Sequence, residues 1–377
     1  MNKTKLKKYN LITLESIRTF FLIFFDSFLR FLFKIIKKEK VQSFKTIFIR
    51  LDGIGDGLLF INNINGSNKD DTLYIIGKRN GNFYKEIDNV KHHIEIDEEK
   101  FRKNVYYRFI ILNQIRCIQS AIVINPLFSR SYTSDTLVNF LISNKKIGFK
   151  GDLINYNFNK FLSKLNNKHY NQLIDLEISE KIHELDINKK LFELINPSKF
   201  FDINSISFNS FYSKKINLNH ENYVIIHVGG SQSLGINIET EFFIKIRDYL
   251  INHYNINIVL TGYSKKEKEI AKEIKNNYDK KITNYVGKLT IREVFSMVDS
   301  AKMIISIDTF IAHIAYMLDK KLIAFKKETS HLNRFLPYPQ HFKSLNSKNV
   351  VFFEKKSDLK FDMIKKLIDF NLSDREH

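Results

Sequence analysis

The chain has 377 residues, of which 44% are hydrophobic and 14% aromatic, so it can fill two globular cores and is not a disordered protein. Its formal net charge is +19, yet it has no zinc-finger spacing, no aromatic RNA-binding signature and no basic region joined to heptads. Anionic lipid or a phosphorylated substrate is therefore a better partner than nucleic acid. The single cysteine, Cys117, excludes an internal disulfide and fits a reducing compartment.

Residues 1–44 are predicted to form a basic amphipathic helix that lies on a membrane surface. The first 45 residues hold eleven Lys and Arg against three Asp and Glu. The uncharged run between Arg18 and Asp26 has seven residues, against the ~20 that a spanning helix needs, and no signal-peptide cleavage site follows. Asp26, Arg30 and Lys34 recur every four residues and indicate a polar face. The alternative is a helix packed on the protein's own surface or at a dimer contact.

The first predicted strand, 46–51, runs into a glycine-rich loop with two acids. The loop supplies Asp52, Gly53, Gly55, Asp56 and Gly57. Glycines before a helix often hold a phosphate, but no lysine follows Gly57 and two carboxylates disfavour an anion. From the residues alone, Asp56 is either a helix cap or a proton acceptor, and Asp52 is better suited to structuring the loop.

The rest of the chain alternates apolar strands with amphipathic helices, which indicates an α/β protein with parallel sheets. The predicted strands are 46–51, 72–76, 120–125, 223–228, 256–261, 282–286, 302–307, 321–325 and 349–353, and the main helices are 239–253, 264–277, 290–299, 309–318 and 358–370. The pattern fails between 196 and 222, which is rich in Asn, Ser and Lys. We therefore expect two Rossmann-like domains that face each other across a cleft.

This pattern predicts five parts. They are the helix 1–44, an N-terminal domain 45–200, a linker 201–221, a C-terminal domain 222–345, and a strand and helix in 346–377 that pack back across the domains.

Several loops after strands of the C-terminal half have the residue types of an anion site. They are Gly229, Gly230 and Ser231 after the first strand, Thr261 and Gly262 after the second, a turn with Lys288 followed by Thr290, and Asp308 and Thr309 before a helix that carries His313. Helix N-termini at the carboxyl ends of strands attract phosphate. Each motif also has a purely structural explanation, as a turn, as a helix cap or, for His313, as a buried polar residue.

Together these pieces resemble glycosyltransferase family 9, the heptosyltransferase family of lipopolysaccharide core assembly, which has a GT-B fold. The resemblance lies in ordered stretches between residues 45 and 345, namely IRLDGIGDGLL, SAIVINPLFSRSYTSDTLVNFLISNKKIGFKGD, HELDINKKLFELI, VIIHVGGS, VLTG, VGKLTIREV and SIDTFIAHIAYML. It implies that domain 45–200 lies on the acceptor side, that domain 222–345 binds the nucleotide sugar, and that Asp56 is the catalytic base. It also implies that Asp308 and Thr309 bind the donor diphosphate, and that the Gly229–Ser231 and Thr261–Gly262 loops lie on the donor side.

The chain also departs from the family pattern. Phe310 and Ile311 stand where the family has Gly-Pro after Asp-Thr, and Gly235–Ile238 has neither the lysine nor the tryptophan expected before the next helix. A phenylalanine forbids the closest backbone approach that glycine permits. Lys326 and Lys327 are candidates to supply the missing positive charge.

The resemblance implies a glycosyltransferase that inverts the sugar's stereochemistry without a metal or other cofactor. No convincing loop carries an Asp-x-Asp metal-ligand pair, since Glu95-Ile96-Asp97 has that shape but lies in a charged segment. Helix N-termini and lysines such as Lys288 or Lys326 are then left to stabilise the leaving diphosphate. The implied donor is ADP-heptose and the implied acceptor a lipid-linked or core oligosaccharide. The expected location is cytoplasmic, on the inner face of the bacterial inner membrane. A catalytically silent glycan-binding or assembly protein, or a transferase with another nucleotide sugar, remains an alternative.

Overall fold

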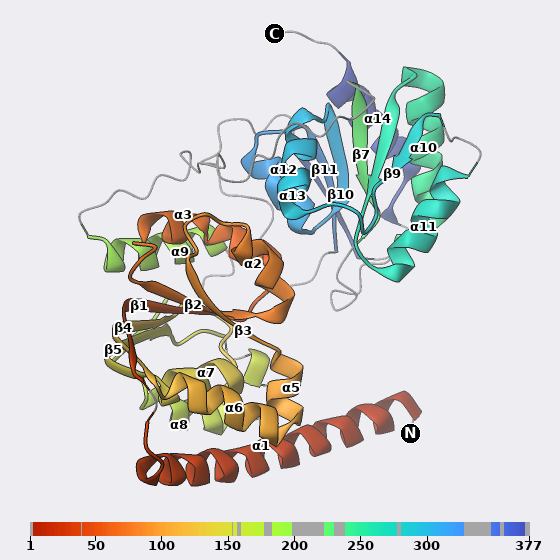
Figure 1. Cartoon of the computed structure of the whole chain (residues 1–377). Coiled ribbons are helices and arrows are strands. Elements are labelled where there is room, and N and C mark those ends of the chain that lie inside the picture. The colour runs from red at the N-terminus through yellow and green to blue at the C-terminus, as the bar shows by residue number, and fades with distance from the viewer. Residues whose placement is uncertain are drawn as a thin grey trace. The chain divides into compact units, whose positions relative to one another are not determined.

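The computed structural model describes residues 3–38, 40–152, 154–156, 160–176, 183–197, 222–229, 238–276, 280–327, 348–354 and 358–373 (Figure 1). The chain divides into two compact units, Met1–Gly53 with Asn63–Glu177, and Ile54–Asn62 with Ile178–His377. The five predicted parts stay a prediction, and the linker 201–221 lies outside the described residues.

Each unit is built on one parallel sheet, which among the described residues has six strands. The first sheet has the order β3-β2-β1-β4-β5-β6 and contains β1 (Gln42–Arg50), β2 (Thr72–Gly77), β3 (His92–Ile96), β4 (Ile118–Asn125), β5 (Ile142–Phe149) and β6 (Gln172–Ile174). The second has the order β12-β11-β10-β7-β8-β9 and contains β7 (Tyr223–His227), β8 (Asn257–Thr261), β9 (Ile282–Asn284), β10 (Met303–Ile307), β11 (Leu322–Lys327) and β12 (Lys348–Phe353). Numbered from its own first strand, each sheet reads 3-2-1-4-5-6, the Rossmann order. The predicted α/β class with two Rossmann-like domains is confirmed.

The fully buried strands consist largely of apolar residues. Every residue of β2 and of β10 is buried, as expected for parallel strands with helices on both faces. The nine predicted strands are present, but β3, β5 and β6 are not among them. In β5 the first half, Ile142–Lys146, carries polar residues that are exposed or half-buried, so it lacks the apolar run that marks a central strand.

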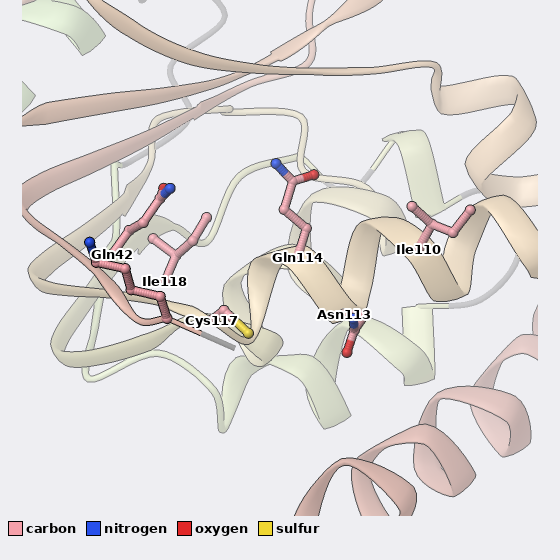
Figure 2. A pocket seen from close by; sticks show the side chains of 7 residues that line it. Gln42, Ile110, Asn113, Gln114, Cys117 and Ile118 are labelled. Atoms are coloured by element: carbon pink, nitrogen blue, oxygen red, sulfur yellow. The ribbon is translucent and has the colours of Figure 1, made fainter. Parts of the chain in front are cut away.

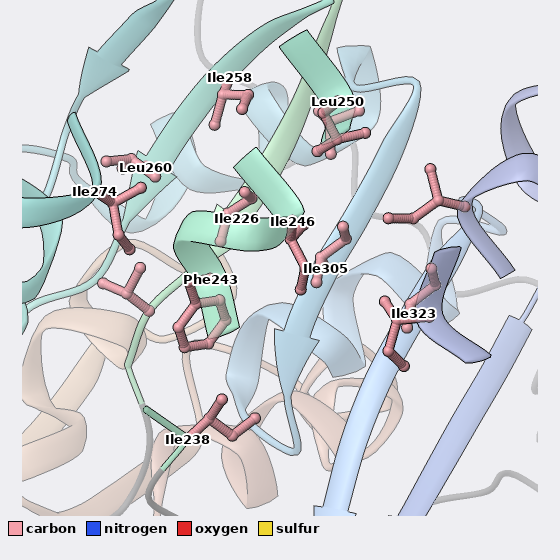
Figure 3. Close-up of a cluster of buried hydrophobic side chains, with 14 of the residues drawn as sticks. Ile226, Ile238, Phe243, Ile246, Leu250, Ile258, Leu260, Ile274, Ile305 and Ile323 are labelled. Carbon is pink, nitrogen blue, oxygen red and sulfur yellow. The ribbon is translucent and has the colours of Figure 1, made fainter. Parts of the chain in front are cut away.

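The second unit has its main core on one face of its sheet. Helices α10 (Thr240–Tyr254), α11 (Lys265–Lys275) and α14 (Phe361–Leu372) pack there through Phe243, Ile246 and Leu250 of α10 and their neighbours (Figure 3). Helix α14 packs on α10, and β12 pairs with β11. Helices α12 (Ile291–Ser300) and α13 (Phe310–Met317) pack on each other. The same unit contains α2 (Ile54–Leu59) and α9 (Glu184–Ile195).

The first unit buries its core beneath a layer of helices. Its remaining elements are α1 (Lys3–Ile35), α4 (Gly81–Lys85), α5 (Glu98–Lys103), α6 (Val105–Ile115), α7 (Tyr132–Phe140), α8 (Lys160–Asn167), η1 (Lys78–Asn80) and η2 (Ile154–Tyr156), while α3 (Ile61–Gly66) spans the boundary between the units. Side chains of α1, α5, α6 and α7 share one cluster with β1 to β4.

Helix α1 is part of this cluster, and the structure corrects the expectation for Asp26. Asp26 does not lie on a solvated polar face, because it is 1% exposed and pairs with the buried Arg108 of α6 at 2.5 Å. Tyr132 donates a further hydrogen bond to Asp26 at 2.7 Å. A charged side chain repeated every four residues looks the same in sequence whether it faces water or a buried partner. No helix in the described part of the chain is long and apolar enough to cross a membrane.

Breaking the Asp26–Arg108 pair should destabilise the fold strongly. Asp26→Leu leaves a buried guanidinium without its carboxylate, which costs about 3–5 kcal/mol of unfolding free energy. Urea unfolding measures the loss, with Asp70→Asn as the control, since Asp70 forms an exposed pair with Lys91 at 2.8 Å. Equal stability of the two variants would contradict the assignment of α1 to the core.

Candidate functional site

The strand order of the second sheet brings two loops together. Strands β7 and β10 are neighbours, with Ile226 beside Ile305. From β7 the chain continues to β8 on one side of this pair, and from β10 it continues to β11 on the other side. Ligands of doubly wound sheets bind at such a switch point, beyond the carboxyl ends of the strands. β7 ends at His227 and β10 ends at Ile307, so the segments with Gly229 and Asp308 both begin at this edge of the sheet. The second unit therefore has its candidate site where the sequence motifs predicted one.

Three ionisable side chains meet at this point. An Asp308 oxygen lies 3.9 Å from Nε2 of His313, and its other oxygen lies 3.9 Å from Nζ of Lys326. Asp308 follows β10, His313 is on α13, and Lys326 is in β11, so three consecutive elements supply them. The side chains are 11%, 6% and 3% exposed. A lysine head so deeply buried is uncommon and needs a partner.

Burial sets the protonation of this cluster. Burial raises the pKa of Asp308 above its usual value, and the positive charge of Lys326 opposes the rise. Burial lowers the pKa of Lys326, and Asp308 opposes that change. Burial also lowers the pKa of His313 to about 4, so its imidazole is neutral at physiological pH. The cluster thus combines one neutral imidazole with a buried acid–lysine pair.

Thr309 stands at the N-cap of α13 but its side chain makes no capping hydrogen bond. Its hydroxyl instead lies 3.1 Å from the hydroxyl of Ser306. The explanation of Thr309 as a simple helix cap is therefore not supported. The two departures from the family pattern serve packing, since Phe310 makes an edge contact with Phe295 of α12 at 6.2 Å and Ile311 is buried.

Asp56 reaches the same cluster. It lies in the first turn of α2, which packs on α13 inside the second unit. The negative charge of Asp56 raises the pKa of His313 against the effect of burial. A Cβ at Gly55 would lie 3.3 Å from Cδ2 of His313, a tight contact that glycine avoids. Gly57 is buried within α2.

Helix α9 holds the other end of α2. Asn188 is fully buried and donates from Nδ2 to the carbonyl of Leu59 at 3.0 Å. His183 caps α9 by accepting from the backbone of Leu185 at 3.1 Å. The HELDIN stretch therefore positions the helix that carries Asp56.

Asp52 has a different environment from Asp56. It pairs with the fully buried Arg50 at 2.5 Å, and its carbonyl accepts a hydrogen bond from Asn80. Arg50 is the last residue of β1. This pair fixes the course of the loop through Gly53, as expected for a structural rather than a catalytic acid.

Gly229 and Gly262, which the resemblance predicts to lie on the donor side, both approach a carboxylate that sequence reasoning missed. A Cβ at Gly229 would lie 2.6 Å from the Glu267 carboxyl carbon, and one at Gly262 would lie 2.8 Å from its Oε2. Glu267 completes a capping box with Ser264 at the start of α11, a pattern visible as Ser-Lys-Lys-Glu. Thr261 lies beside His227, with Oγ1 to Nδ1 at 3.0 Å.

Other predicted residues do not join the cluster or cannot be placed. Lys288 is exposed, and its Nζ donates to the carbonyl of Asn284 at 2.9 Å, so it folds back on its own turn. Thr290 caps α12 as predicted. Gly230, Ser231 and most of the Gly235–Ile238 segment lie outside the described residues, while Ile238 belongs to the second core.

A second buried network follows β4 in the first unit. Asp135 accepts hydrogen bonds from Tyr170 at 2.5 Å, from Asn125 at 3.3 Å and from Tyr156, and it pairs with Arg130 at 3.2 Å. Burial raises the pKa of Asp135, and Arg130 opposes the rise. The network fixes the loop at the carboxyl end of β4. No short sequence motif reveals it, because its members are spread from Asn125 to Tyr170.

A pocket of about 280 Å³ lies in the first unit, near the amino ends of β1 and β4 (Figure 2). Its lining consists of Lys40, Gln42, Ile110, Asn113, Gln114, Cys117 and Ile118. Sites of parallel α/β sheets lie at the carboxyl ends, so this pocket is not the candidate site. Within the described residues, no group of three or more His, Cys, Asp or Glu side chains is arranged to hold a metal ion.

Solved structures share this fold. The E. coli heptosyltransferase WaaC with ADP-2-deoxy-2-fluoro heptose matches with a TM-score of 0.65 and 16% identity, over 87% of this chain and 99% of that one. A glycosyl transferase family 9 protein from Veillonella parvula gives 0.63 and 13%, over 89% and 99%. The E. coli ADP-heptose lps heptosyltransferase II gives 0.59 and 14%, over 88% and 100%. The architecture is accordingly of the GT-B type.

The family model of glycosyltransferase family 9 (heptosyltransferase) matches residues 131–357, more than half of the chain. A search of curated protein sequences finds no match. The chain belongs to glycosyltransferase family 9, and it is a glycosyltransferase.

The buried imidazole should make the protein sensitive to acid. The unfolded chain protonates His313 near the ordinary pKa of about 6.5, whereas the folded chain does so near 4. The unfolded state binds more protons between these values, so the free energy of unfolding falls as the pH drops through this window. His313→Gln should reduce the fall between about pH 7 and about pH 5 by about 2 kcal/mol.

Denaturant unfolding across this pH range measures the effect. His253→Gln, at an exposed position, is the matched control and should retain the pH dependence of the parent. An unchanged dependence in His313→Gln would refute the assignment of a buried neutral imidazole.

Proposed function

We propose that this enzyme is a metal-independent, inverting glycosyltransferase in which Asp56 is the general base and the first turn of α13 with Lys326 receives the donor diphosphate. The observation that carries the proposal is the grouping of Asp56, His313, Asp308 and Lys326 in one unit, at the switch point of its sheet. A proton acceptor and an anion site in such proximity are what glycosyl transfer requires.

The reaction would proceed in one displacement. The acceptor hydroxyl gives its proton to a carboxylate oxygen of Asp56 while its oxygen forms a bond to C1 of the donor sugar. The bond between C1 and the diphosphate oxygen breaks, and the electron pair leaves with the nucleoside diphosphate. Attack on the face opposite the leaving group inverts the configuration at C1.

Charge on the departing diphosphate would be stabilised by protein groups. The backbone N–H groups at the start of α13 and the helix dipole favour an anion, and the hydroxyl of Thr309 is not used as a cap. Lys326 adds a cation whose interaction gains strength from burial. Asp308 would hold Lys326 in place and accept hydrogen bonds from sugar hydroxyls. Gly229, Thr261 and Gly262 would line the donor side.

The proposed donor is ADP-heptose, and the proposed acceptor is a lipopolysaccharide core or other surface glycan. Support for the donor comes from the family and from the similar WaaC, which was solved with an ADP-heptose analogue. The loop with Asp52 and the first unit would take the acceptor. The enzyme would work in the cytoplasm, on the inner face of the bacterial inner membrane.

A second candidate function is a catalytically silent glycan-binding or assembly protein. The observation that favours it is the loss of the family's Gly-Pro at Phe310 and Ile311, where packing against α12 leaves less room for a close phosphate contact. A transferase with a different nucleotide sugar is the third possibility. Transfer assays with a panel of nucleotide sugars separate the three.

Asp56→Asn should lower the rate of sugar transfer by about 10²–10⁴-fold and leave nucleoside diphosphate affinity unchanged, because it removes the proton acceptor but no phosphate contact. Asp362→Asn, also an aspartate in a helix's first turn, is the matched control and should keep full activity. Full transfer by Asp56→Asn would eliminate Asp56 as the base. Absence of transfer by the parent with every donor would favour the silent candidate.

Lys326→Gln should weaken ADP binding by about tenfold to a hundredfold, because one charge-assisted hydrogen bond to phosphate is lost. Lys288→Gln is the control and should bind normally, since Lys288 folds back on Asn284. Isothermal titration gives both affinities, and Lys326→Arg, which keeps the charge, should bind better than Lys326→Gln. Equal losses at Lys288 and Lys326 would contradict the proposed diphosphate site.

A further inference from the structure

Helix α1 has two opposite faces with different surroundings. Its inner face packs on the first unit through Leu22, Asp26, Leu29 and Phe33, which are between 1% and 8% exposed. Its outer face carries what we call the aromatic stripe. The aromatic stripe consists of Ile17, Phe20, Phe21, Phe24, Phe28, Phe31 and Ile35, exposed by 55% to 73%.

The spacing of the stripe is that of one helix face. Steps of three and four residues lead from Ile17 to Ile35, so these side chains form a continuous apolar band about 27 Å long. A soluble surface scatters its large apolar residues singly, and an apolar patch of this length indicates a binding surface.

Two arginines of the neighbouring segment fix α1 in place. Arg108 holds the middle of the helix through Asp26. Arg116 caps its C-terminal end by donating to the carbonyls of Phe33 at 3.0 Å, Ile36 at 3.1 Å and Lys37 at 3.2 Å. These carbonyls belong to the last turn and the residues after it, which have no partners within the helix. These contacts hold the stripe on the first unit, and Figure 1 shows α1 running beside α6.

Further aromatic contacts keep the inner face occupied. Phe33 packs on Phe109 of α6 at 5.8 Å and on Phe140 of α7 at 6.0 Å. Arg30 lies over the ring of Phe140 at 5.7 Å. Because these contacts use the inner face and its flank, α1 cannot rotate the stripe into the protein without breaking them.

Basic residues predominate in the segment that carries the stripe. The charged residues from Arg18 to Lys40 are Arg18, Asp26, Arg30, Lys34, Lys37, Lys38, Glu39 and Lys40. Arg108 neutralises Asp26, so the basic residues dominate. Two copies of the chain joined through this stripe would bring like charges together, which disfavours a dimer. An anionic lipid surface supplies the opposite charge and an apolar layer for the phenylalanines.

We propose that the aromatic stripe of α1 is a membrane-docking surface, which lies in the plane of an anionic bilayer and inserts its phenylalanines at the headgroup boundary. Docking would bring the enzyme to a lipid-borne acceptor, and this role of the stripe rests on the proposed function. Docking itself needs only the stripe and its basic flank. It requires no spanning helix, and none is found in the described part of the chain.

Vesicle sedimentation tests the proposal with the full-length protein. Vesicles of phosphatidylcholine with phosphatidylglycerol should bind the parent, vesicles of phosphatidylcholine alone should bind it much less, and added salt should weaken binding. The double variant Phe24→Gln with Phe28→Gln should bind about a hundredfold less tightly, since each exposed phenylalanine contributes roughly tenfold. The control is Met363→Gln with Phe370→Gln on α14, at exposed apolar positions on another helix, and it should bind like the parent.

Two results would overturn the proposal. One is unchanged vesicle binding by the Phe24→Gln, Phe28→Gln variant. The other is a dimer of the parent, seen by sedimentation velocity without vesicles, that this variant dissociates, because the stripe would then bind a second copy. Transfer to a soluble acceptor and ADP binding are measured in parallel and should not change in the variant. Failure of those assays in the parent would count against the proposed function and not against docking.

Discussion

Strands β7 and β10 lie side by side although all of β8, β9 and three helices separate them in the chain. This pairing arises because the connection after β9 does not lead to a neighbouring strand. It returns the chain past β8 and β7 to β10, which lies parallel to β7. Parallel strands send their carboxyl ends to one edge, so the loop after β7, the start of α13 and the end of β11 meet there. The position of Asp308 between His313 and Lys326 follows from that arrangement. The proposed chemistry depends on it as well, because no single segment contains a complete site.

Buried charge pairs then fix the parts that the sheets bring together. Arg50 with Asp52 sets the loop after β1, Arg130 with Asp135 sets the loop after β4, and Arg108 with Asp26 attaches α1. Each pair is costly to bury and costly to break, so it favours one conformation of its loop or helix over the alternatives. Lys326 and Asp308 differ from these pairs in their longer separation of 3.9 Å. That spacing is consistent with a lysine that exchanges its carboxylate partner for a phosphate.

Much of the fold could be predicted from the sequence because the central strands are apolar on both faces. Strands such as β2 and β10 can be recognised from their composition, whereas β3, β5 and β6 lie at or near the edges of their sheet and carry polar residues. The role of Asp26 could not be read from helical periodicity, which gives a side chain's direction but not its neighbour. The same limit applies to Glu267, whose capping pattern is visible while its position between Gly229 and Gly262 is not. Among the candidate site residues, Asp308, His313 and Lys326 come together. Asp308 follows β10, His313 lies on the helix after it, and Lys326 lies near the end of the neighbouring strand β11. Lys288 does not join them, because its own turn offers a closer carbonyl.

The central claim is that a nucleoside diphosphate binds at the carboxyl ends of β7 and β10, on the start of α13. Hydrogen–deuterium exchange of the full-length protein with and without ADP tests it most directly, because backbone N–H groups are the proposed ligands. The account predicts ADP-dependent protection at the start of α13, around residues 308–313, and in the loop after β7. Helix α14, none of whose residues belongs to the cluster of Asp308, His313 and Lys326, should exchange at the same rate in both conditions. Protection confined to the first sheet, or to the pocket near Cys117, would contradict the account.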